Sequence, residues 1–438
     1  HLNRLFAAML VAAAYLSLAT LGVRNVALKC LDLPLPLGSL FASIFLFFVP
    51  LALLALTGPF LVRFMAHRLQ NVGGIVGRLS ALSTVGSLTG TALIGYALIP
   101  FAPNSVTMFA TSALIAALAV IHFVVWGRRP WEATAVAGLA LALGALGVWF
   151  DHHPQFSQMT QLFRGNSNFG QLQVMESRDK EVRLYLNDYL IQNTYAPATR
   201  QSVSVFTYAL EGLARSHAEK LDAALCIGMG IGIVPTHLAK AGARVDVVEI
   251  NPAVVPLAER FFDLDVSKFN LTLGDGRQFL NRCTNRYDAV VLDAFLGDAS
   301  PSHLMTREAF SAMRGVMTTN GVLVINCISD PTGGRDFLLA SLTKTLQAVF
   351  GNVRLYLSDN GNAFFVASPA PLQVHHKLDL NGVHPAVVDR LRSTLNRVHE
   401  TDPHHGRVLT DDFNPAEFFD AGNRERLRRD LAKGMAAL

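Results

Sequence analysis

Long apolar stretches follow one another through the first 150 residues of the 438-residue chain. They cover about residues 5–21, 38–62, 79–101, 105–126 and 131–150. A helix needs roughly 20 apolar residues to cross a bilayer. A signal peptide would explain one such stretch but not five in series, and a water-soluble bundle would show charged faces. The pattern therefore predicts an N-terminal all-α transmembrane domain of about five spans at residues 1–150, in contact with a lipid bilayer.

One of these stretches, residues 77–101, carries small residues at helical spacing. Gly86 and Gly90 form a GxxxG pair that serine and threonine residues flank. Small side chains let two helix backbones come close in lipid. We expect this stripe to pack within the chain, with a homodimer as the alternative. Ionisable residues are absent at mid-membrane depth, which weakens a function in ion transport.

After residue 150 the hydrophobic pattern changes to that of a globular domain. Residues 170–177 and 182–192 alternate apolar and polar positions, which predicts a small antiparallel β unit within a segment that covers 151–220. From residue 222 short apolar strands alternate with helices, which predicts a doubly wound parallel sheet. The predicted fold is therefore a helical membrane bundle, the β unit, an α/β Rossmann-like domain at 221–370, and a C-terminal tail and helix at 371–438.

Glycines and acids follow the first four strands of this predicted sheet, where ligands bind in such folds. They are Gly228, Gly230 and Gly232 after the first strand, Glu249 at the end of the second, Asp275 and Gly276 after the third, and Asp293 at the end of the fourth. A glycine loop lets backbone amides approach a ligand. The first acid has the spacing of a ribose ligand, and the second is placed to contact an adenine amino group.

The nucleotide that fits this pattern better is S-adenosylmethionine or its decarboxylated form. NAD would suit a glycine loop followed by an acid, but the spacing here is GxGxG rather than GxGxxG. One nucleoside and one reacting sulfonium would occupy the four adjacent turns. Neither the four scattered cysteines nor the six late histidines have the spacing of metal ligands, so we expect no metal. The mild net charge of +4, without a basic run, indicates no nucleic-acid partner.

Several of these segments together resemble the spermidine synthase family of aminopropyltransferases. The resemblance covers about residues 165–370 and is carried by "LCIGMGIGIVP", "VDVVEINPAVVPLAERFF", "LTLGDGRQFL", "YDAVVLDAF" and "LMTREAF". The apolar half is similar to a subgroup in which such a domain is fused to transmembrane helices. The resemblance implies that decarboxylated S-adenosylmethionine gives its aminopropyl group to an amine and leaves methylthioadenosine.

The resemblance also implies roles for single residues. Asp293 would deprotonate and orient the attacking amine as a general base. Gln192 would lie at the donor site, and Gln173 would face the same cleft. Tyr208, Asp298 and Asp411 are candidates for contact with the second substrate.

Departures from the family pattern change the expected substrate. Ile231 stands where the family has an acid that holds the amine of the donor, and Leu296 replaces a second acid, with Asp298 displaced by two positions. Phe206, Thr207 and Tyr208 replace a Tyr-His-Glu triplet. A polyamine needs several carboxylates around it, so putrescine is not the expected acceptor.

Three functions remain open at this point. The first is an aminopropyltransferase-like enzyme that acts on an unusual amine or on an acceptor presented at the membrane. The second is use of intact S-adenosylmethionine, as a methyl donor or by internal cleavage in a lyase or cyclase reaction. The third is a membrane sensor or transporter whose nucleotide domain is catalytically idle. The three retained acids favour an enzyme.

The arginine-rich loops conflict with the cellular location that this chemistry requires. Arg63, Arg68 and Arg78 gather in one loop, and Arg128 and Arg129 in the loop two spans later. The positive-inside rule places both loops in the cytoplasm, and five spans would then put the catalytic domain outside. The donor is a cytosolic metabolite, so we expect a bacterial-type inner-membrane protein with a cytoplasmic catalytic domain, in which one stretch does not cross or the charge rule fails.

Overall fold

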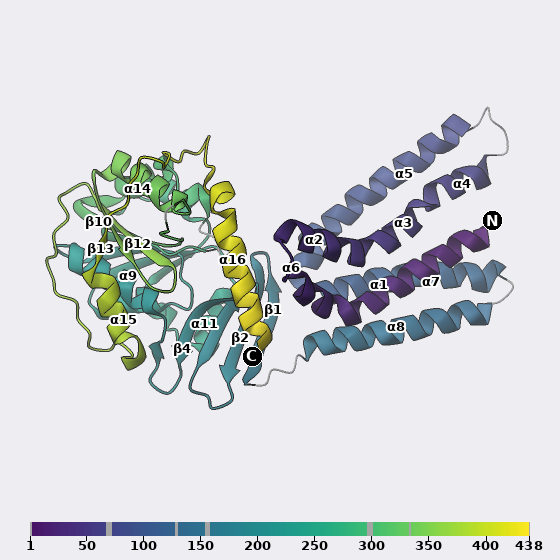
Figure 1. The fold of residues 1–438 in the computed structure, drawn as a ribbon, viewed down its shortest axis with the longest axis horizontal. Helices are drawn as coiled ribbons and strands as arrows, with labels where there is room; N and C mark the ends of the chain where they lie inside the picture. Colours follow the sequence, from purple (N-terminus) through teal and green to yellow (C-terminus); the bar gives the residue numbers. More distant parts are fainter. Residues whose placement is uncertain are drawn as a thin grey trace. The chain divides into compact units, whose positions relative to one another are not determined.

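The chain forms two compact units, residues 1–157 and residues 158–438 (Figure 1). The structure is a computed structural model that describes residues 2–66, 72–127, 130–153, 158–295, 301–332 and 334–437. The small β unit, the Rossmann-like domain and the C-terminal tail, which the sequence divides into separate segments, lie together in the second unit.

The first unit is entirely helical in its described residues. Its helices are α1 (Leu2–Cys30), α2 (Leu35–Ser43), α3 (Val49–Ala55), α4 (Thr57–Met65), α5 (Val72–Leu93), α6 (Ile99–Phe101), α7 (Asn104–Trp126) and α8 (Pro130–His152). Within the described ranges, five continuous helical segments are long and apolar enough to cross a membrane. They are Leu2–Cys30, Leu35–Met65, Val72–Phe101, Asn104–Trp126 and Pro130–His152, and each contains one of the predicted spans.

Small residues let α1 approach α8 closely. A Cβ atom added to Gly144 would lie 2.0 Å from Ser17 Oγ, and the Ser17 hydroxyl donates to the Ala140 carbonyl at 2.8 Å. On the α7 side, the Ser112 hydroxyl donates to Ala13 O at 2.7 Å. Close backbone contact and interhelical hydrogen bonds of this kind hold helices together where lipid removes the hydrophobic drive.

The GxxxG stripe does not contribute to this packing. No atom of the described chain lies within 4 Å of a Cβ atom added to Gly86 or Gly90. The expectation that the stripe packs within the chain is therefore wrong, because the close contacts of the helical unit are made by the glycines of α8 instead. A homodimer through this stripe stays a prediction.

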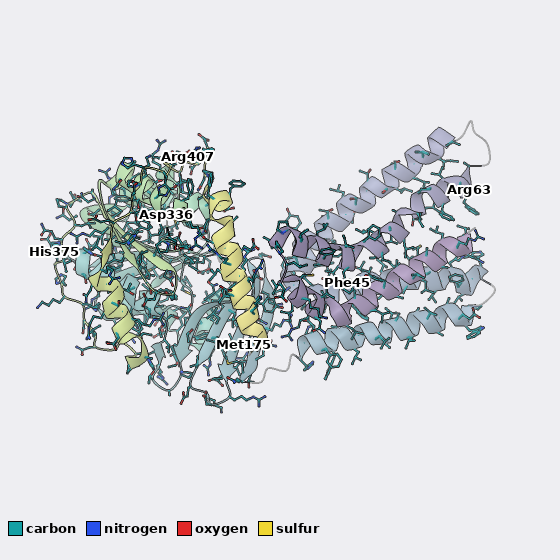
Figure 2. The ribbon with its side chains drawn as sticks, in the orientation of Figure 1. Phe45, Arg63, Met175, Asp336, His375 and Arg407 are labelled. Carbon is teal, nitrogen blue, oxygen red and sulfur yellow. The ribbon has the colours of Figure 1, made fainter. Side chains whose placement is uncertain are left out.

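Two π-helical turns interrupt the second and third apolar segments. They are Ile44–Phe48 and Ile94–Leu98, and a proline follows each of them two residues later, at Pro50 and Pro100. Proline has no N–H to donate to the preceding turn, so the backbone widens locally to accommodate the ring. Phe45, labelled in Figure 2, lies in the first of these turns, and its carbonyl accepts a hydrogen bond from the Tyr15 hydroxyl.

The second unit begins with the predicted small antiparallel sheet. Its strands are β1 (Met159–Ser167), β2 (Gly170–Ser177), β3 (Arg183–Asn187), β4 (Leu190–Ala196) and β5 (Gln201–Ser202), hydrogen-bonded in that order. Successive residues of a strand face opposite sides of a sheet. Leu172, Val174 and Tyr185 consequently face the main hydrophobic core of this unit, and Gln173 and Leu186 face the other side.

The main sheet has eight strands in the order β13-β11-β12-β10-β9-β6-β7-β8. These are β6 (Ala223–Ile227), β7 (Arg244–Glu249), β8 (Asn270–Leu273), β9 (Tyr287–Leu292), β10 (Met317–Ile328), β11 (Asn352–Leu357), β12 (Asn362–Ser368) and β13 (Val398–His399). The run from β10 to β8 is parallel, which confirms the Rossmann-like prediction. β12 pairs antiparallel with β10, β11 with β12, and β13 with β11. The sheet is therefore mixed rather than wholly parallel.

Helices cover both faces of this sheet (Figure 1). They are α9 (Val205–His217), α10 (Ile233–Lys240), α11 (Val254–Phe261), α12 (Gly276–Arg282), α13 (Arg307–Gly315), α14 (Phe337–Phe350), α15 (Pro385–Asn396) and α16 (Ala416–Ala437). Alternate residues of the central strand β6 enter two separate cores: Cys226 packs with α9, α10, α11 and α15, and Leu225 packs with α13 and α14. The central strands are therefore buried on both faces, and their polar chemistry is confined to their ends.

Candidate active site

A cavity of about 420 Å³ opens beyond the carboxyl ends of the parallel strands. Glu249 from β7, Asp275 after β8 and Asp293 after β9 all line it. Residues of β3, β4, the start of α9, and Leu427 and Leu431 of α16 complete the wall. The volume is in the range of small-molecule sites in proteins. The three acids predicted from the sequence therefore line one cavity of suitable size.

The glycine loop after β6 owes its shape to two close contacts. Gly228 has φ of +93°, and a Cβ atom there would lie 2.2 Å from the Asp293 carbonyl oxygen. Gly230 has φ of +53° and would bring its Cβ to 3.1 Å from Asn193 Oδ1. Both glycines line the cavity. The backbone of the loop is therefore exposed to a ligand, and the carboxylate-bearing turn after β9 packs directly against it.

Glu249 is buried and its carboxylate is held by backbone amides. Met229 N donates to Glu249 Oε2 at 2.9 Å, and Asn251 N donates to Oε1 at 2.8 Å. Burial raises the pKa of Glu249 above its ordinary value, and the two amides oppose this shift. Each carboxylate oxygen can accept a further hydrogen bond. The side chain is therefore fixed at the strand end with lone pairs available for the hydroxyl groups of a ligand.

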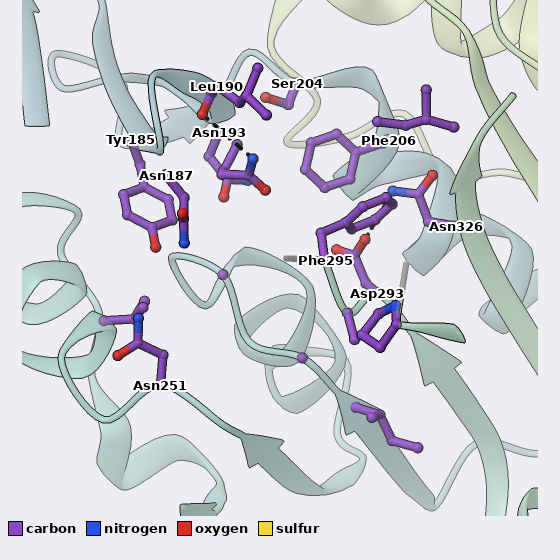
Figure 3. Close-up of a pocket in the computed structure, with 18 of the residues that line it drawn as sticks. Tyr185, Asn187, Leu190, Asn193, Ser204, Phe206, Asn251, Asp293, Phe295 and Asn326 are labelled. Carbon is purple, nitrogen blue, oxygen red and sulfur yellow. Dashed lines mark hydrogen bonds between the residues drawn. The ribbon is translucent and has the colours of Figure 1, made fainter. Parts of the chain in front are cut away.

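Asp293 is the acid with the most perturbed proton affinity in the cavity wall. Burial raises its pKa to about 6, the charge of Glu249 adds to the rise, and the hydrogen bond from Asn326 opposes it. Asn326 Nδ2 donates to Asp293 Oδ1 at 2.9 Å, and Asn362 Nδ2 in turn donates to Asn326 Oδ1 at 2.9 Å. Figure 3 shows the first of these bonds and the rings of Phe206 and Phe295 near the carboxylate. A carboxylate with a pKa near neutrality can accept a proton in catalysis.

Asp275 caps a helix and also lines the cavity. Its Oδ1 caps α12 by accepting from Gln278 N at 2.8 Å, and its Oδ2 lies 3.1 Å from His303 Nε2. Gly276, the first residue of α12, also lines the cavity, and a Cβ atom there would lie 2.6 Å from Ile227 Cγ2. This corner therefore presents a carboxylate, an imidazole and a helix N-terminus to the cavity.

Two further candidates face away from the cavity, contrary to the expectation from sequence. Gln173 pairs with Leu186 across β2 and β3, so its side chain is on the opposite side of the small sheet from the cavity-lining Tyr185. Tyr208 is buried in the core, where its hydroxyl donates to Ser202 O at 2.9 Å. It lies two residues after Phe206, about 200° around the helix, and Phe206 lines the cavity in its place.

Gly232 and Asp411 are also outside the cavity lining. Gly232 has φ of +81°, and a Cβ atom there would lie 2.3 Å from Leu264 Cδ1, so this glycine serves packing. Asp411 Oδ2 accepts from Arg277 at 2.9 Å, and its Oδ1 accepts from the Thr306 hydroxyl at 2.6 Å, which ties the C-terminal tail to α12 and α13. Gln192 lines the cavity, whereas Asp298 lies outside the described residues.

Neutral amides form much of the remaining polar wall, and the sequence prediction missed them. They are Asn187, Asn193, Asn251, Asn326, Asn360 and Asn362. In the view of Figure 3, Tyr185, Asn187 and Asn251 lie on the side opposite Asp293. Ile231, which replaces an acid of the family pattern, is buried in the core and does not line the cavity. The cavity wall thus carries neutral amides beside its three acids, and these amides do not stand at the positions that depart from the family pattern.

The described residues contain no group of three or more histidine, cysteine, aspartate or glutamate side chains placed to hold a metal ion. The polar side chains of the cavity lining are mainly carboxylates and amides, with the imidazole of His303 and the guanidinium of Arg390. They suit a nucleoside with hydroxyl and amino groups better than they suit a cation.

Comparisons with known proteins identify the family of this chain. Residues 205–358 match the Spermine/spermidine synthase domain. The chain is 30% identical over 212 residues to a polyamine aminopropyltransferase of Vibrio vulnificus, an alignment that covers 45% of this chain and 69% of the relative. The chain belongs to the spermidine synthase family. It is therefore a transferase.

Two other similarities mark the breadth of this family resemblance. An N-terminal histidine N-methyltransferase of Emericella nidulans is 29% identical over 214 residues, which are 44% of this chain and 38% of that protein. The crystal structure of a probable spermidine synthase from Corynebacterium glutamicum superposes with a TM-score of 0.43 at 16% identity, over 61% of this chain and 95% of that one. The proteins similar to this chain in sequence thus include an aminopropyltransferase and an N-methyltransferase.

We expect Gly228→Ala to damage the site more than an equally strained glycine elsewhere. The added Cβ would meet the Asp293 carbonyl oxygen at 2.2 Å and would displace the carboxylate turn. Gly242→Ala is the matched control, because Gly242 also has a positive φ of +99° but has open space around it. Each variant should lose about 1–2 kcal/mol from the positive φ, and Gly228→Ala should in addition lose at least about tenfold in donor affinity. Calorimetric titration with S-adenosylmethionine measures the difference, and equal affinities would contradict the close-contact argument.

Proposed function

We propose that the protein transfers the alkyl chain of S-adenosylmethionine, or of its decarboxylated form, to an amine and releases methylthioadenosine. The observation that carries the proposal is the single cavity in which Glu249, Asp275 and Asp293 meet at adjacent strand ends. Glu249 would accept hydrogen bonds from the ribose hydroxyls, and Asp275 would accept one from the adenine amino group. Asp293 would then lie at the reacting end.

The proposed reaction is a displacement at the carbon next to the sulfonium. The lone pair of the acceptor nitrogen forms the new C–N bond, and the C–S bond breaks with its electron pair moving to sulfur. The sulfonium becomes the neutral thioether of methylthioadenosine. The nitrogen loses one proton to Asp293 Oδ2, for which the described chain shows no hydrogen-bond partner. The proton passes to solvent, which restores the carboxylate.

The lining of the cavity supports intact S-adenosylmethionine as the donor. Asn187, Asn193 and Asn251 in this lining are neutral, and Ile231, which stands where the family pattern has an acid for the donor amine, is buried in the core. An amide can donate to a carboxylate and accept from an ammonium group. An α-amino-carboxylate end is therefore compatible with this wall, and a carboxylate wall would repel it.

A second candidate function is transfer of the methyl group of the same donor. It is supported by the fungal N-methyltransferase relative. The same base could serve both reactions, since each needs a deprotonated nitrogen close to the sulfonium. The two differ in the carbon that is attacked and therefore in the nucleoside product.

Product analysis separates the two candidates. Purified full-length protein is incubated with either donor and with candidate amines, and the nucleosides are followed by mass spectrometry. We expect methylthioadenosine to accumulate with time and with amine concentration. Accumulation of S-adenosylhomocysteine would contradict alkyl transfer and support methylation.

Replacement of Asp293 tests the assigned base. We expect Asp293→Asn to lower turnover by about 10²–10⁴-fold while donor affinity changes little, because the amide keeps the shape but cannot accept the proton. Asp389→Asn, on the exposed side of α15, is the control and should retain full turnover. Wild-type turnover should fall as pH drops through about 6, since the ionised carboxylate is the active form. A pH profile that stays the same in Asp293→Asn would overturn the assignment.

We also propose that the helical unit spans a membrane and that the catalytic unit faces the cytosol, where the donor is made. The five apolar helical segments support insertion by length and composition. The full-length protein should stay in the membrane pellet after an alkaline wash and enter solution only with detergent. Release by alkali alone would show that the helices lie on the membrane surface or fold without lipid.

A further inference from the structure

A second cavity of about 600 Å³ adjoins the first. The two share the lining residues Ile328, Asn360 and Leu427, which come from the end of β10, the turn between β11 and β12, and α16. Asn326 of β10 donates to Asp293, and Asn362 at the start of β12 donates to Asn326. Each of these asparagines is two residues from a shared lining residue, Ile328 or Asn360. The second cavity therefore begins on the Asp293 side of the donor cavity, where a second substrate must enter.

Two hydroxyl groups in this second cavity lack a hydrogen-bond partner within the described chain. They are Ser329 Oγ and Ser358 Oγ, both buried, and Ser329 as a whole is only 5% exposed. The backbone amides of both residues are engaged, with Gly361 O at 3.0 Å and Asn362 O at 2.9 Å respectively. A buried hydroxyl without a partner is unfavourable. These two groups are accordingly available to a polar ligand at the floor of the cavity.

Some of the charges around the second cavity are neutralised inside the protein. Asp330 forms ion pairs with Arg335 at 3.3 Å and with Arg426 at 3.1 Å. Asp420 is buried and accepts from Asn423 Nδ2 at 2.8 Å. These groups shape the wall and need no ligand to satisfy them.

Three other charged residues of the lining have no ion pair or side-chain hydrogen bond in the described structure: Arg397, Asp359 and Asp430. They come from three different elements, namely the segment after α15, the turn between β11 and β12, and α16. One cation and two carboxylates around a polar hollow match a ligand end that carries both a carboxylate and an ammonium group.

We propose that the second cavity binds the α-amino acid end of a diamino acid, whose other amine is the acceptor of the transferred group. This proposal rests on the proposed function of the first cavity and names the acceptor class for it. Arg397 binds the carboxylate, Asp359 and Asp430 attract the α-ammonium group, and the Ser329 and Ser358 hydroxyls donate or accept at the floor. The short alkyl chain then carries the distal amine past Ile328 and Asn360 to Asp293.

Pairs of amines that differ only in the carboxylate test this assignment. L-Ornithine and putrescine form one pair, and L-lysine and cadaverine form the other. With full-length protein in detergent, we expect kcat/KM to be at least about tenfold higher for each amino acid than for its decarboxylated partner, because the latter lacks the carboxylate that forms the charged hydrogen bond with Arg397. Equal or faster turnover of the diamines would overturn the proposal.

Variants assign the preference to the second cavity. Arg397→Gln should reduce the amino acid preference about tenfold, whereas Arg392→Gln on the exposed face of α15 should not alter the preference. Ser329→Ala should raise KM for L-ornithine with little effect on kcat, and Ser311→Ala on α13 is its matched control. An unchanged preference in Arg397→Gln and an unchanged KM in Ser329→Ala would place the acceptor elsewhere.

A binding measurement tests the second cavity without depending on catalysis. Calorimetric titration of L-ornithine into protein saturated with methylthioadenosine reports the second cavity without turnover. Binding that Ser329→Ala and Arg397→Gln weaken would support the assignment even if product analysis contradicted alkyl transfer. Absence of binding, in a protein that releases methylthioadenosine with another amine, would overturn the assignment and leave the proposed function standing.

Discussion

The site depends on two carboxylates kept at the ends of strands that flank the same central strand. Glu249 ends β7 and Asp293 follows β9, on either side of β6, and the charge of Glu249 adds to the burial that raises the pKa of Asp293. Two backbone amides hold the oxygens of Glu249, whereas Asp293 receives one hydrogen bond, from Asn326. The unequal number of donors separates their roles: the first acid is fixed for binding, and the second can exchange a proton near neutral pH.

Much of this arrangement could be predicted from the sequence, because parallel strands force their carboxyl ends to one edge. Glu249, Asp275 and Asp293 each follow an apolar strand, so the topology alone brings them together. The alternating pattern of residues 170–177 likewise predicts the small sheet. The antiparallel strands β11 and β12 were missed, since a short apolar run in a C-terminal region does not reveal its partner or its direction.

The predictions that failed concern residues whose role depends on the direction in which the side chain points. Gln173 is one position out of register with the cavity face of its sheet, and Tyr208 is two helix positions beyond the cavity-lining Phe206. Asp411 is held by Arg277, a partner 134 residues away that no local pattern indicates. The asparagines of the wall were missed for a related reason: an isolated amide carries no sequence motif, and the role of Asn326, for example, emerges only from the hydrogen bond it makes to Asp293.

The differences from the family pattern are coherent once both cavities are considered. The wall of the first cavity carries neutral amides beside its three acids, and amides tolerate a zwitterionic donor but cannot neutralise a polycation. Carboxylates are also found in the adjoining cavity, together with Arg397, on a wall that α16 helps to build. Leu427 of α16 lines both hollows. The C-terminal helix therefore lies where it can determine which acceptor reaches Asp293, and the geometry of the strand ends can serve a different amine without any change in the reacting carboxylate.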